Sequence, residues 1–155
     1  MDYPTLFLNI ISGLLIAIVT AIVTVRLSLR QFYSQKWWGK RAEAYTSILE
    51  SLHYMKRSFD EEFNADLMGR ELSEARQKQL RKKFLSGYDE LQKRLDISHF
   101  ILSDEANKAL KEFKADYQEA KDAPSWAEHL YHGLNATDTA IKKLSNVAKN
   151  DLKGH

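Results

Sequence analysis

Apolar residues fill the beginning of the chain without interruption, and further along they recur at helical spacing. Residues 6–25, LFLNIISGLLIAIVTAIVTV, contain no charged side chain. A helix needs about 20 predominantly apolar residues to cross the hydrocarbon core of a bilayer. The pattern therefore predicts a transmembrane anchor over residues 1–27.

Charged residues flank this apolar run unequally. Asp2 is the only charged residue before it. The charged residues that follow it are basic, with no acid among them: Arg26, Arg30, Lys36, Lys40 and Arg41. Positive charge resists translocation, so the N-terminus is predicted to face outward and the rest to stay in the cytoplasm. A cleaved secretory signal has a basic segment before a shorter apolar core. Residues 1–5, MDYPT, contain no Lys or Arg, which favours a retained anchor.

Small and polar residues recur on one stripe of the predicted span. They are Asn9, Gly13, Ala17, Ala21 and Thr24. Small residues let two helices approach closely, and Asn or Thr side chains form hydrogen bonds between them. The stripe predicts a face for packing against other copies, or the polar lining of a pore in an open oligomer. The alternative is that Ala and Thr are simply common in membrane spans.

Residues 28–40 form a juxtamembrane segment in which aromatic residues alternate with bases. The aromatic residues are Phe32, Tyr33, Trp37 and Trp38. Aromatic rings with polar edges settle at the depth of the lipid headgroups, and Lys or Arg bind lipid phosphates, so contact with membrane lipids is favoured over a single-stranded nucleic-acid site. Gly39 lowers helix stability and is predicted to be a hinge before a cytoplasmic helical domain over residues 41–155.

Four further segments have apolar residues every three or four positions, as amphipathic helices do. The first ends at Gly69, and the second runs from Leu72 or Ser73 to about Leu95 or Phe100. The third is capped by Ser103, and the fourth opens after Pro124 with a capping box formed by Ser125 and Glu128. The predicted core consists of Trp38, Tyr45, Ile48, Leu49, Leu52, Met55, Phe59, Phe63, Leu80, Phe84, Tyr88, Leu91, Leu95, Ala106, Leu110, Phe113, Tyr117, Trp126, Leu130, Leu134, Thr137, Ile141, Leu144 and Ala148. The predicted fold class is all-α: one N-terminal transmembrane helix followed by a cytoplasmic antiparallel bundle of about four helices.

The composition excludes several classes of chemistry. The chain has no cysteine, so disulfides and thiolate metal sites are absent. It has no nucleotide-hydrolysing loop, no glycine-rich phosphate cradle and no serine nucleophile elbow, and we predict that it is not an enzyme and needs no cofactor. The excess of bases lies between Arg26 and Arg41, so the remainder is near neutral and no DNA-binding role is predicted.

Glu50 and His53 form an E-x-x-H pair of the kind that ferritin-like bundles use for iron. Such a site needs a second E-x-x-H and two more Glu residues on facing helices, and the chain has no second copy. No metal site is therefore predicted. A metal-dependent enzyme would have to be built from His53, His99, His129 and His132.

Two clusters indicate ligand contact. The basic run of the second helix contains Arg76, Lys78, Arg81, Lys82 and Lys83 without an intervening acid. The aromatic cluster, in SWAEHLYHGLN, contains Trp126, His129, Tyr131, His132 and Asn135. Bases bind phosphates, aromatic rings stack on nucleobases, and Asn pairs with the adenine edge. The alternative is a solvated helix face and ordinary groups at the rim of a core.

The segment FYSQKWWGKRAEAYTSILESLHYMK, with the later LSDEA and SWAEHL, resembles a scattered group of short bacterial single-span proteins with a helical cytoplasmic domain, most without an assigned role. In length, single span and small helical domain the chain is also similar to the membrane effectors of type III CRISPR systems. In those effectors cyclic tetra-adenylate binds a tetrameric cytoplasmic domain and perturbs the membrane.

The resemblance implies an antiviral effector of the bacterial inner membrane that is a homotetramer, binds cyclic tetra-adenylate, and opens a pore or disrupts the bilayer. In this hypothesis the phosphates contact Arg81, Lys82 and Lys83, the adenines contact Tyr131, His132 and Asn135, and Trp126 and His129 pack behind them. The first alternative is a membrane-tethered scaffold that binds a partner protein without a small ligand. The second is a holin-like toxin that acts without a signal.

Overall fold

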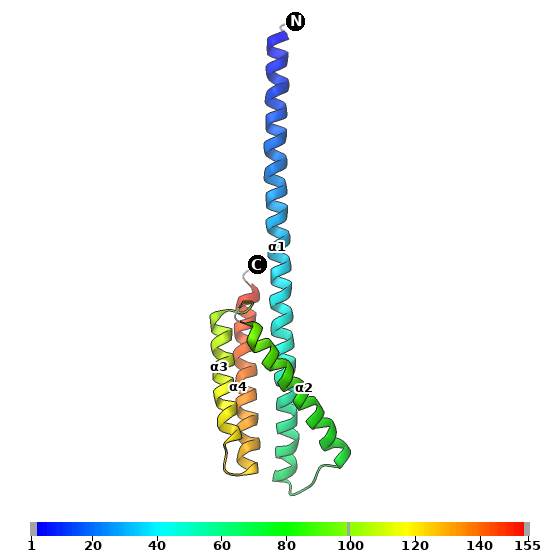
Figure 1. Ribbon diagram of the computed structural model, residues 1–155, viewed down its shortest axis with the longest axis vertical. Coiled ribbons are helices and arrows are strands. Elements are labelled where there is room, and N and C mark those ends of the chain that lie inside the picture. Colours follow the sequence, from blue (N-terminus) through cyan, green and yellow to red (C-terminus); the bar gives the residue numbers. More distant parts are fainter. Residues whose placement is uncertain (1–2, 99, 154–155) are drawn as a thin grey trace. The chain divides into compact units, whose positions relative to one another are not determined.

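The computed structural model describes the backbone of residues 3–98 and 100–153, and the side chains from residue 13 onward within these ranges. Over these residues it contains four helices and no strand, which confirms the all-α prediction (Figure 1). The helices are α1 (Tyr3–Leu67), α2 (Glu74–Ser98), α3 (Asp104–Lys121) and α4 (Trp126–Lys153). Contacts divide the chain into residues 1–39 and residues 40–155, and the second part is called the helical unit below.

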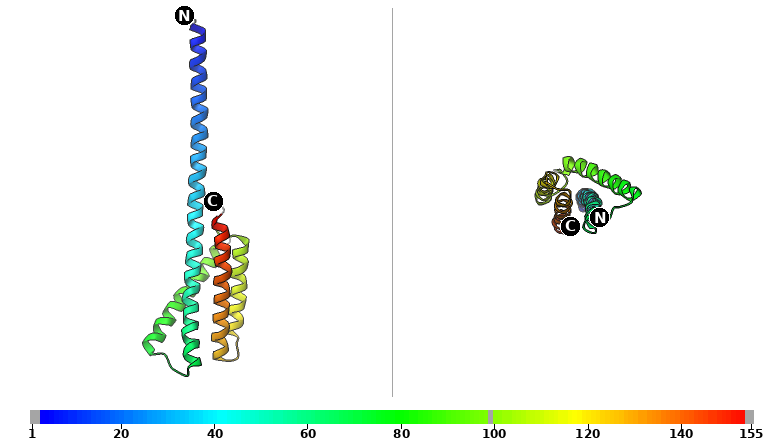
Figure 2. Two further views of the ribbon diagram at one scale, coloured as in Figure 1. Left: turned by 180° about the vertical axis from the view of Figure 1, so that it is seen from behind. Right: turned by 90° about the horizontal axis from the view of Figure 1, so that it is seen from below.

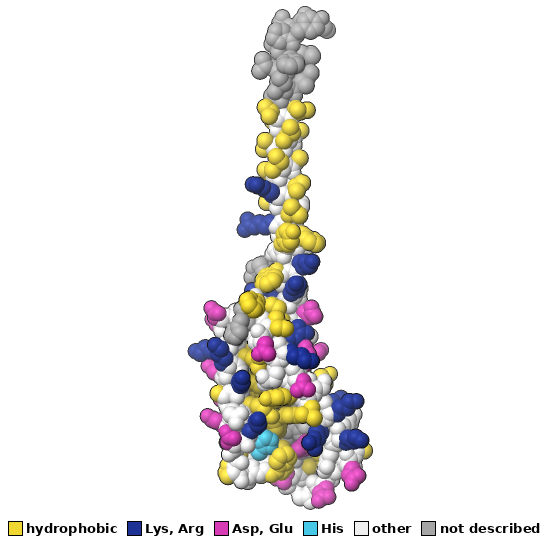
Figure 3. All heavy atoms as spheres, in the orientation of Figure 1, with side chains coloured by type: hydrophobic (Ala, Val, Ile, Leu, Met, Phe, Trp, Pro, Cys, Tyr) yellow, Lys and Arg dark blue, Asp and Glu magenta, His cyan; other side chains and the backbone are white. Residues whose placement is uncertain are grey.

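The N-terminal part of α1 is apolar, and its described side chains, over residues 13–40, are exposed. It is long and apolar enough to cross a membrane by length and composition. Figure 3 shows hydrophobic side chains around this part with Lys and Arg toward its C-terminal end, whereas Asp and Glu are seen only over the helical unit. Trp38, predicted to lie in the core, is 40% exposed, because among the described residues burial begins only at Ala44. α1 is helical through Gly39, so the predicted hinge is not a break in the helix.

The end of α1 is set by Gly69, as the sequence predicted. Gly69 has a φ of 59°, a left-handed conformation that costs glycine little. Its N–H donates to the Asp66 carbonyl at 3.0 Å, and the Arg70 N–H donates to the Ala65 carbonyl at 3.0 Å. This is the Schellman pattern, and it satisfies carbonyl groups that the helix end leaves free.

Serine side chains cap the beginnings of the other helices. The Ser103 hydroxyl accepts from the Ala106 N–H at 3.3 Å, and the Ser125 hydroxyl accepts from the Glu128 N–H at 3.2 Å. Each bond satisfies one of the N–H groups that the first turn of a helix leaves without a partner. The predicted starts of α3 and α4 are thereby confirmed.

One hydrophobic core joins the four helices within the helical unit. Its fully buried large side chains are Tyr45, Ile48, Leu52, Met55, Leu80, Leu91, Leu110, Leu130, Thr137 and Leu144, all of them predicted core residues. The Thr137 hydroxyl bonds back to the carbonyls of Gly133 and Leu134, which satisfies a polar atom inside the core. Trp126 was wrongly assigned to the core: it is 59% exposed because it is the first residue of α4.

The helices are not all aligned. α3 and α4 lie antiparallel and side by side, whereas α2 crosses the unit obliquely (Figures 1 and 2). α2 buries few residues fully, namely Leu80, Gly87, Leu91 and Ser98. The regular antiparallel packing predicted for all the helices is therefore wrong for α2, whose narrow buried stripe does not require alignment with its neighbours.

Two glycines allow close contact between helices. A Cβ atom added at Gly87 of α2 would lie 2.8 Å from the Ser51 carbonyl oxygen of α1. A Cβ atom added at Gly133 of α4 would lie 2.5 Å from the ring of Phe59. Both separations are shorter than real Cβ contacts, so each helix approaches α1 only because its glycine lacks a side chain.

Polar side chains connect three elements at the end of the unit where α1 enters it. The Tyr45 hydroxyl donates to Asp151 of α4, and the Arg41 Nε–H donates to the Ile101 carbonyl at 2.9 Å. Burial and the hydrogen bond to Asp151 raise the pKa of Tyr45 to about 12, so the hydroxyl keeps its proton. These bonds attach the end of α4 and the connection between α2 and α3 to the start of the packed part of α1.

Two carboxylates of the helical unit each accept hydrogen bonds from two bases. Glu61 of α1 bonds to Arg76 of α2 and to Arg57, and together they lower the pKa of Glu61 to about 2. Asp138 of α4 is paired with Lys142 and with Lys56 of α1, and these contacts lower its pKa to about 2. The pairs therefore link α1 to both α2 and α4.

We expect the protein to lose thermal stability as the pH falls from about 4.5 toward about 2. The lowered pKa values mean that, between these two pH values, the unfolded chain takes up protons while the folded carboxylates remain charged. The stabilisation by the two carboxylates is therefore complete above about pH 4.5 and is lost as the pH falls toward about 2. Circular dichroism melts of the full chain in detergent will measure it. The double variant Glu61→Gln with Asp138→Asn should flatten the pH dependence, and Glu105→Gln, at an exposed acid of α3, should not. An unchanged pH dependence in the double variant would contradict this assignment.

Candidate ligand-binding site

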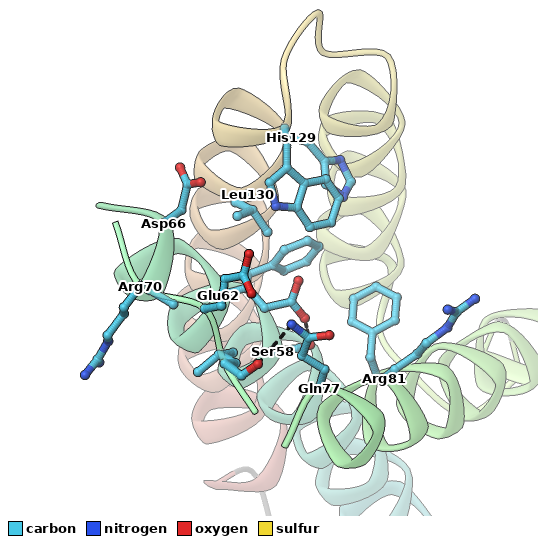
Figure 4. A pocket seen from close by; sticks show the side chains of 14 residues that line it. Ser58, Glu62, Asp66, Arg70, Gln77, Arg81, His129 and Leu130 are labelled. Atoms are coloured by element: carbon cyan, nitrogen blue, oxygen red, sulfur yellow. Dashed lines mark hydrogen bonds between the residues drawn. The ribbon is translucent and has the colours of Figure 1, made fainter. Parts of the chain in front are cut away.

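A pocket of about 470 Å³ lies within the helical unit, and we call it the α1–α2–α4 pocket. Its walls come from the C-terminal part of α1, the connection between α1 and α2, α2 itself and the first turns of α4 (Figure 4). The oblique course of α2 and the Schellman turn at Gly69 place these elements around one space. The volume lies in the range of pockets that bind small molecules, about 300–1,000 Å³.

Aromatic side chains form one wall of the pocket. The Phe59 ring centroid lies 5.3 Å from that of Phe84 and 5.6 Å from that of His129, both in edge-to-face geometry. Trp126 stacks on His129 at 5.1 Å, and the indole is more than half exposed. Aromatic rings favour such edge-to-face and offset arrangements. The wall therefore presents stacking surface to the pocket.

The His129 ring is held by its Nδ1 atom. This atom lies 2.8 Å from the Ala120 carbonyl oxygen at the end of α3. A carbonyl only accepts, so Nδ1 carries a hydrogen and donates it. The bond fixes the orientation of the imidazole under Trp126.

Charged side chains of both signs surround the aromatic wall. The acids are Glu62, Asp66 and Glu71, and the bases are Arg70 and Arg81. Glu62 accepts from the Ser58 hydroxyl at 3.1 Å. Figure 4 shows Glu62 extending toward the middle of the group and the guanidinium ends of Arg70 and Arg81 at its periphery. Acids thus outnumber bases around the pocket.

A polar contact orders the connection between α1 and α2. The Gln77 side-chain amide of α2 donates to the Leu72 carbonyl at 3.1 Å. Ser73 caps α2 through its hydroxyl, which accepts from the Arg76 N–H at 3.4 Å. Leu72 and Glu71 are thereby positioned at the edge of the pocket by the start of α2.

The pocket brings together three of the eight residues predicted to bind ligand: Arg81, Trp126 and His129. The other five are exposed and do not line it: Lys82, Lys83, Tyr131, His132 and Asn135. The Lys83 ammonium lies 5.7 Å from the centre of the Tyr54 ring, over another part of α1. The Tyr131 ring lies 5.9 Å from Phe63 and 5.5 Å from His132.

Sequence reasoning missed several pocket residues. Phe59 and Phe84 were assigned to the core alone, and Glu62, Asp66 and Glu71 were not singled out. No local motif joins these acids. They share only their positions in sequence, just before and after the Gly69 turn. These positions indicate a common site only once α2 is known to fold back across α1.

Where they are described, the remaining candidate residues form no recognisable site. Glu50 and His53 are exposed, and the described part of the chain holds no group of three or more His, Asp or Glu side chains that could bind a metal. His99 and the Asn9 side chain lie outside what is described. Gly13, Ala17, Ala21 and Thr24 of the span are exposed, and the Thr24 hydroxyl bonds to the Thr20 carbonyl of its own helix.

Comparisons with protein-family models, with curated proteins and with solved structures found no match to this chain. Function is therefore inferred from the residues and their arrangement.

Proposed function

We propose that the protein is a membrane-anchored receptor in which the helical unit binds a small molecule and α1 relays binding to the membrane. In this proposal the apolar part of α1 spans the bacterial inner membrane with its N-terminus outward, and the helical unit lies in the cytoplasm. The basic residues after the apolar run support this orientation.

The α1–α2–α4 pocket is the observation that carries the proposal. Apolar pockets of this volume with a few polar groups are the usual form of small-molecule sites. The pocket also has an incompletely covered indole at Trp126, whose burial by a ligand would be favourable. A ligand changes the state of a receptor only if it binds one arrangement better than another. Ser58, Phe59 and Glu62 of α1 line the pocket, so a ligand there acts directly on this helix.

The resemblance to type III CRISPR effectors gives a more specific form of the proposal, an antiviral effector activated by cyclic tetra-adenylate. A ligand with fourfold repetition suits a symmetric homotetramer, because each subunit offers the same contacts to one nucleotide. Lys82 and Lys83 are exposed and lie outside the pocket, so the phosphates would bind to these two lysines from several subunits. Rearrangement of the spans would then open a pore or disrupt the bilayer.

A second candidate is a scaffold that binds a partner protein, and exposed apolar residues favour it. Leu67 and Met68, at the end of α1, are each about two-thirds exposed, and Leu85 of α2 is half exposed. Large exposed apolar patches on soluble surfaces mark contacts with other proteins. In this case the partner, rather than a small ligand, would be recruited to the membrane.

Titration of the purified full chain in nanodiscs with cyclic tri-, tetra- and hexa-adenylate tests the nucleotide form. We expect the cyclic tetramer alone to bind and to raise the melting temperature, because a ligand stabilises the fold that it binds. Replacing Lys82 and Lys83 by Ala should weaken binding. Lys149→Ala, which removes an exposed base of α4, is the matched control.

The outcomes separate the candidates. Absence of binding by all three rings to folded protein would reject the nucleotide form. Stoichiometric co-purification of one defined protein, lost on Leu67→Asp or Met68→Asp but retained on Trp126→Ala, would then support the scaffold.

A further inference from the structure

We propose that the α1–α2–α4 pocket selects an organic cation with a flat apolar body, such as an aromatic amine. The inference rests on the proposed small-molecule function of this pocket and specifies the ligand class. It concerns a different surface from that of Lys82 and Lys83, which lie outside the pocket and where a nucleotide would bind.

The aromatic wall accounts for the flat apolar body. Phe59, Phe84 and the exposed indole of Trp126 line the same pocket. His129 is fixed between Trp126 and Phe59 by its bond to Ala120, so the wall is already ordered for stacking. A planar ring inserted here would cover the indole, and aromatic contacts of this kind add to the gain from burial.

The acids account for the positive charge. Glu62 lies in the middle of the lining side chains, and its hydrogen bond from neutral Ser58 leaves its negative charge uncompensated (Figure 4). Asp66 and Glu71 make no ion pair with any described residue. A ligand cation would therefore meet carboxylates that have no basic partner among the described residues, and one of them, Glu62, is partly shielded from water, where charge interactions are stronger.

The nearby bases do not neutralise the negative charge of these acids within the pocket. The guanidinium ends of Arg70 and Arg81 lie at the periphery of the group in Figure 4. Arg76, close by on α2, is engaged by Glu61 outside the lining. A polyphosphate would face three acids here, whereas an ammonium group would face them favourably and would also be attracted to the face of the Trp126 indole.

Three indole derivatives that share one ring system provide the test. Tryptamine carries an ammonium group, tryptophol carries a neutral hydroxyl, and indole-3-acetate carries a carboxylate. The full chain in nanodiscs of neutral phosphatidylcholine is titrated with each by calorimetry, with empty nanodiscs as the blank. We expect tryptamine to bind at least about tenfold more tightly than tryptophol, and indole-3-acetate to bind most weakly.

Variants place the effect in the pocket. Glu62→Gln should remove most of the preference for tryptamine over tryptophol while leaving the melting temperature unchanged. Glu105→Gln, the matched control, should leave this preference intact. Trp126→Ala should weaken the binding of both tryptamine and tryptophol. Trp37→Ala, which removes an exposed side chain outside the helical unit, should weaken the binding of neither.

Equal binding of tryptamine and tryptophol, both sensitive to Trp126→Ala, would overturn the charge preference and leave the pocket as a ligand site. Preference for tryptamine that survives Glu62→Gln would overturn the role given to this acid. Failure of all three indoles to bind folded protein would reject the inference, whereas the proposed receptor function is rejected only if the titration with cyclic oligoadenylates fails as well.

Discussion

Phe59→Ala is expected to lower the free energy of unfolding by about 3–5 kcal/mol, as for other buried aromatic side chains replaced by Ala. Phe59 is 4% exposed and contacts the rings of Phe84, Tyr117 and His129 from three other helices. The space left by the ring would not close easily, because His129 is held in place by the Ala120 carbonyl. Urea unfolding of the full chain in detergent, followed by helical circular dichroism, will measure the change.

Phe100→Ala is the matched control for this loss. The Phe100 side chain is 80% exposed, so its removal should change the free energy of unfolding by no more than about 0.5 kcal/mol. If the two variants were equally stable, the assignment of Phe59 to the centre of the core would be wrong.

Gly87→Ala is expected to destabilise the helical unit by about 1–3 kcal/mol, the usual cost of overpacking. The new methyl group would lie 2.8 Å from the Ser51 carbonyl oxygen and 3.3 Å from the Tyr54 Cβ atom. The nearest atom belongs to the backbone of α1, so no side-chain rotation relieves the contact. Thermal melts of the full chain in detergent will show the effect as a lower melting temperature.

Gly39→Ala is the control for the same chemical change. It lies within α1, and its added Cβ atom would have no neighbour within 4 Å. This variant should be neutral or more stable by up to about 1 kcal/mol, because Ala is the better helix former. Equal melting temperatures for the Gly87 and Gly39 variants would show that α2 does not approach α1 at Ser51.

The helix ends were predictable because their chemistry is local. The left-handed Gly69, the cap Ser103 before α3 and the cap Ser125 before α4 each act on backbone groups within a few residues. The core was predictable for a related reason: a helix buries one face, so apolar spacing identifies residues such as Leu110 and Leu144.

The direction of α2 and the pocket were not predictable in this way. Both depend on how closely helices approach, which is set by the absence of a side chain at Gly87 and has no periodic signal. Trp126 was misplaced because heptad spacing was extended to the first residue of α4. Of the candidate site, Arg81, Trp126 and His129 were identified, but the acids of the pocket come together only through tertiary structure.

Gly133 and Phe59 occupy one shared space, since an added Cβ atom at Gly133 would overlap the phenyl ring at 2.5 Å. Divergence at the two positions is therefore coupled. A side chain at position 133 needs a smaller one at position 59, and either change alone destabilises the core. Because Phe59 also lines the pocket, the packing of α4 against α1 restricts how rapidly the shape of this pocket can change during evolution.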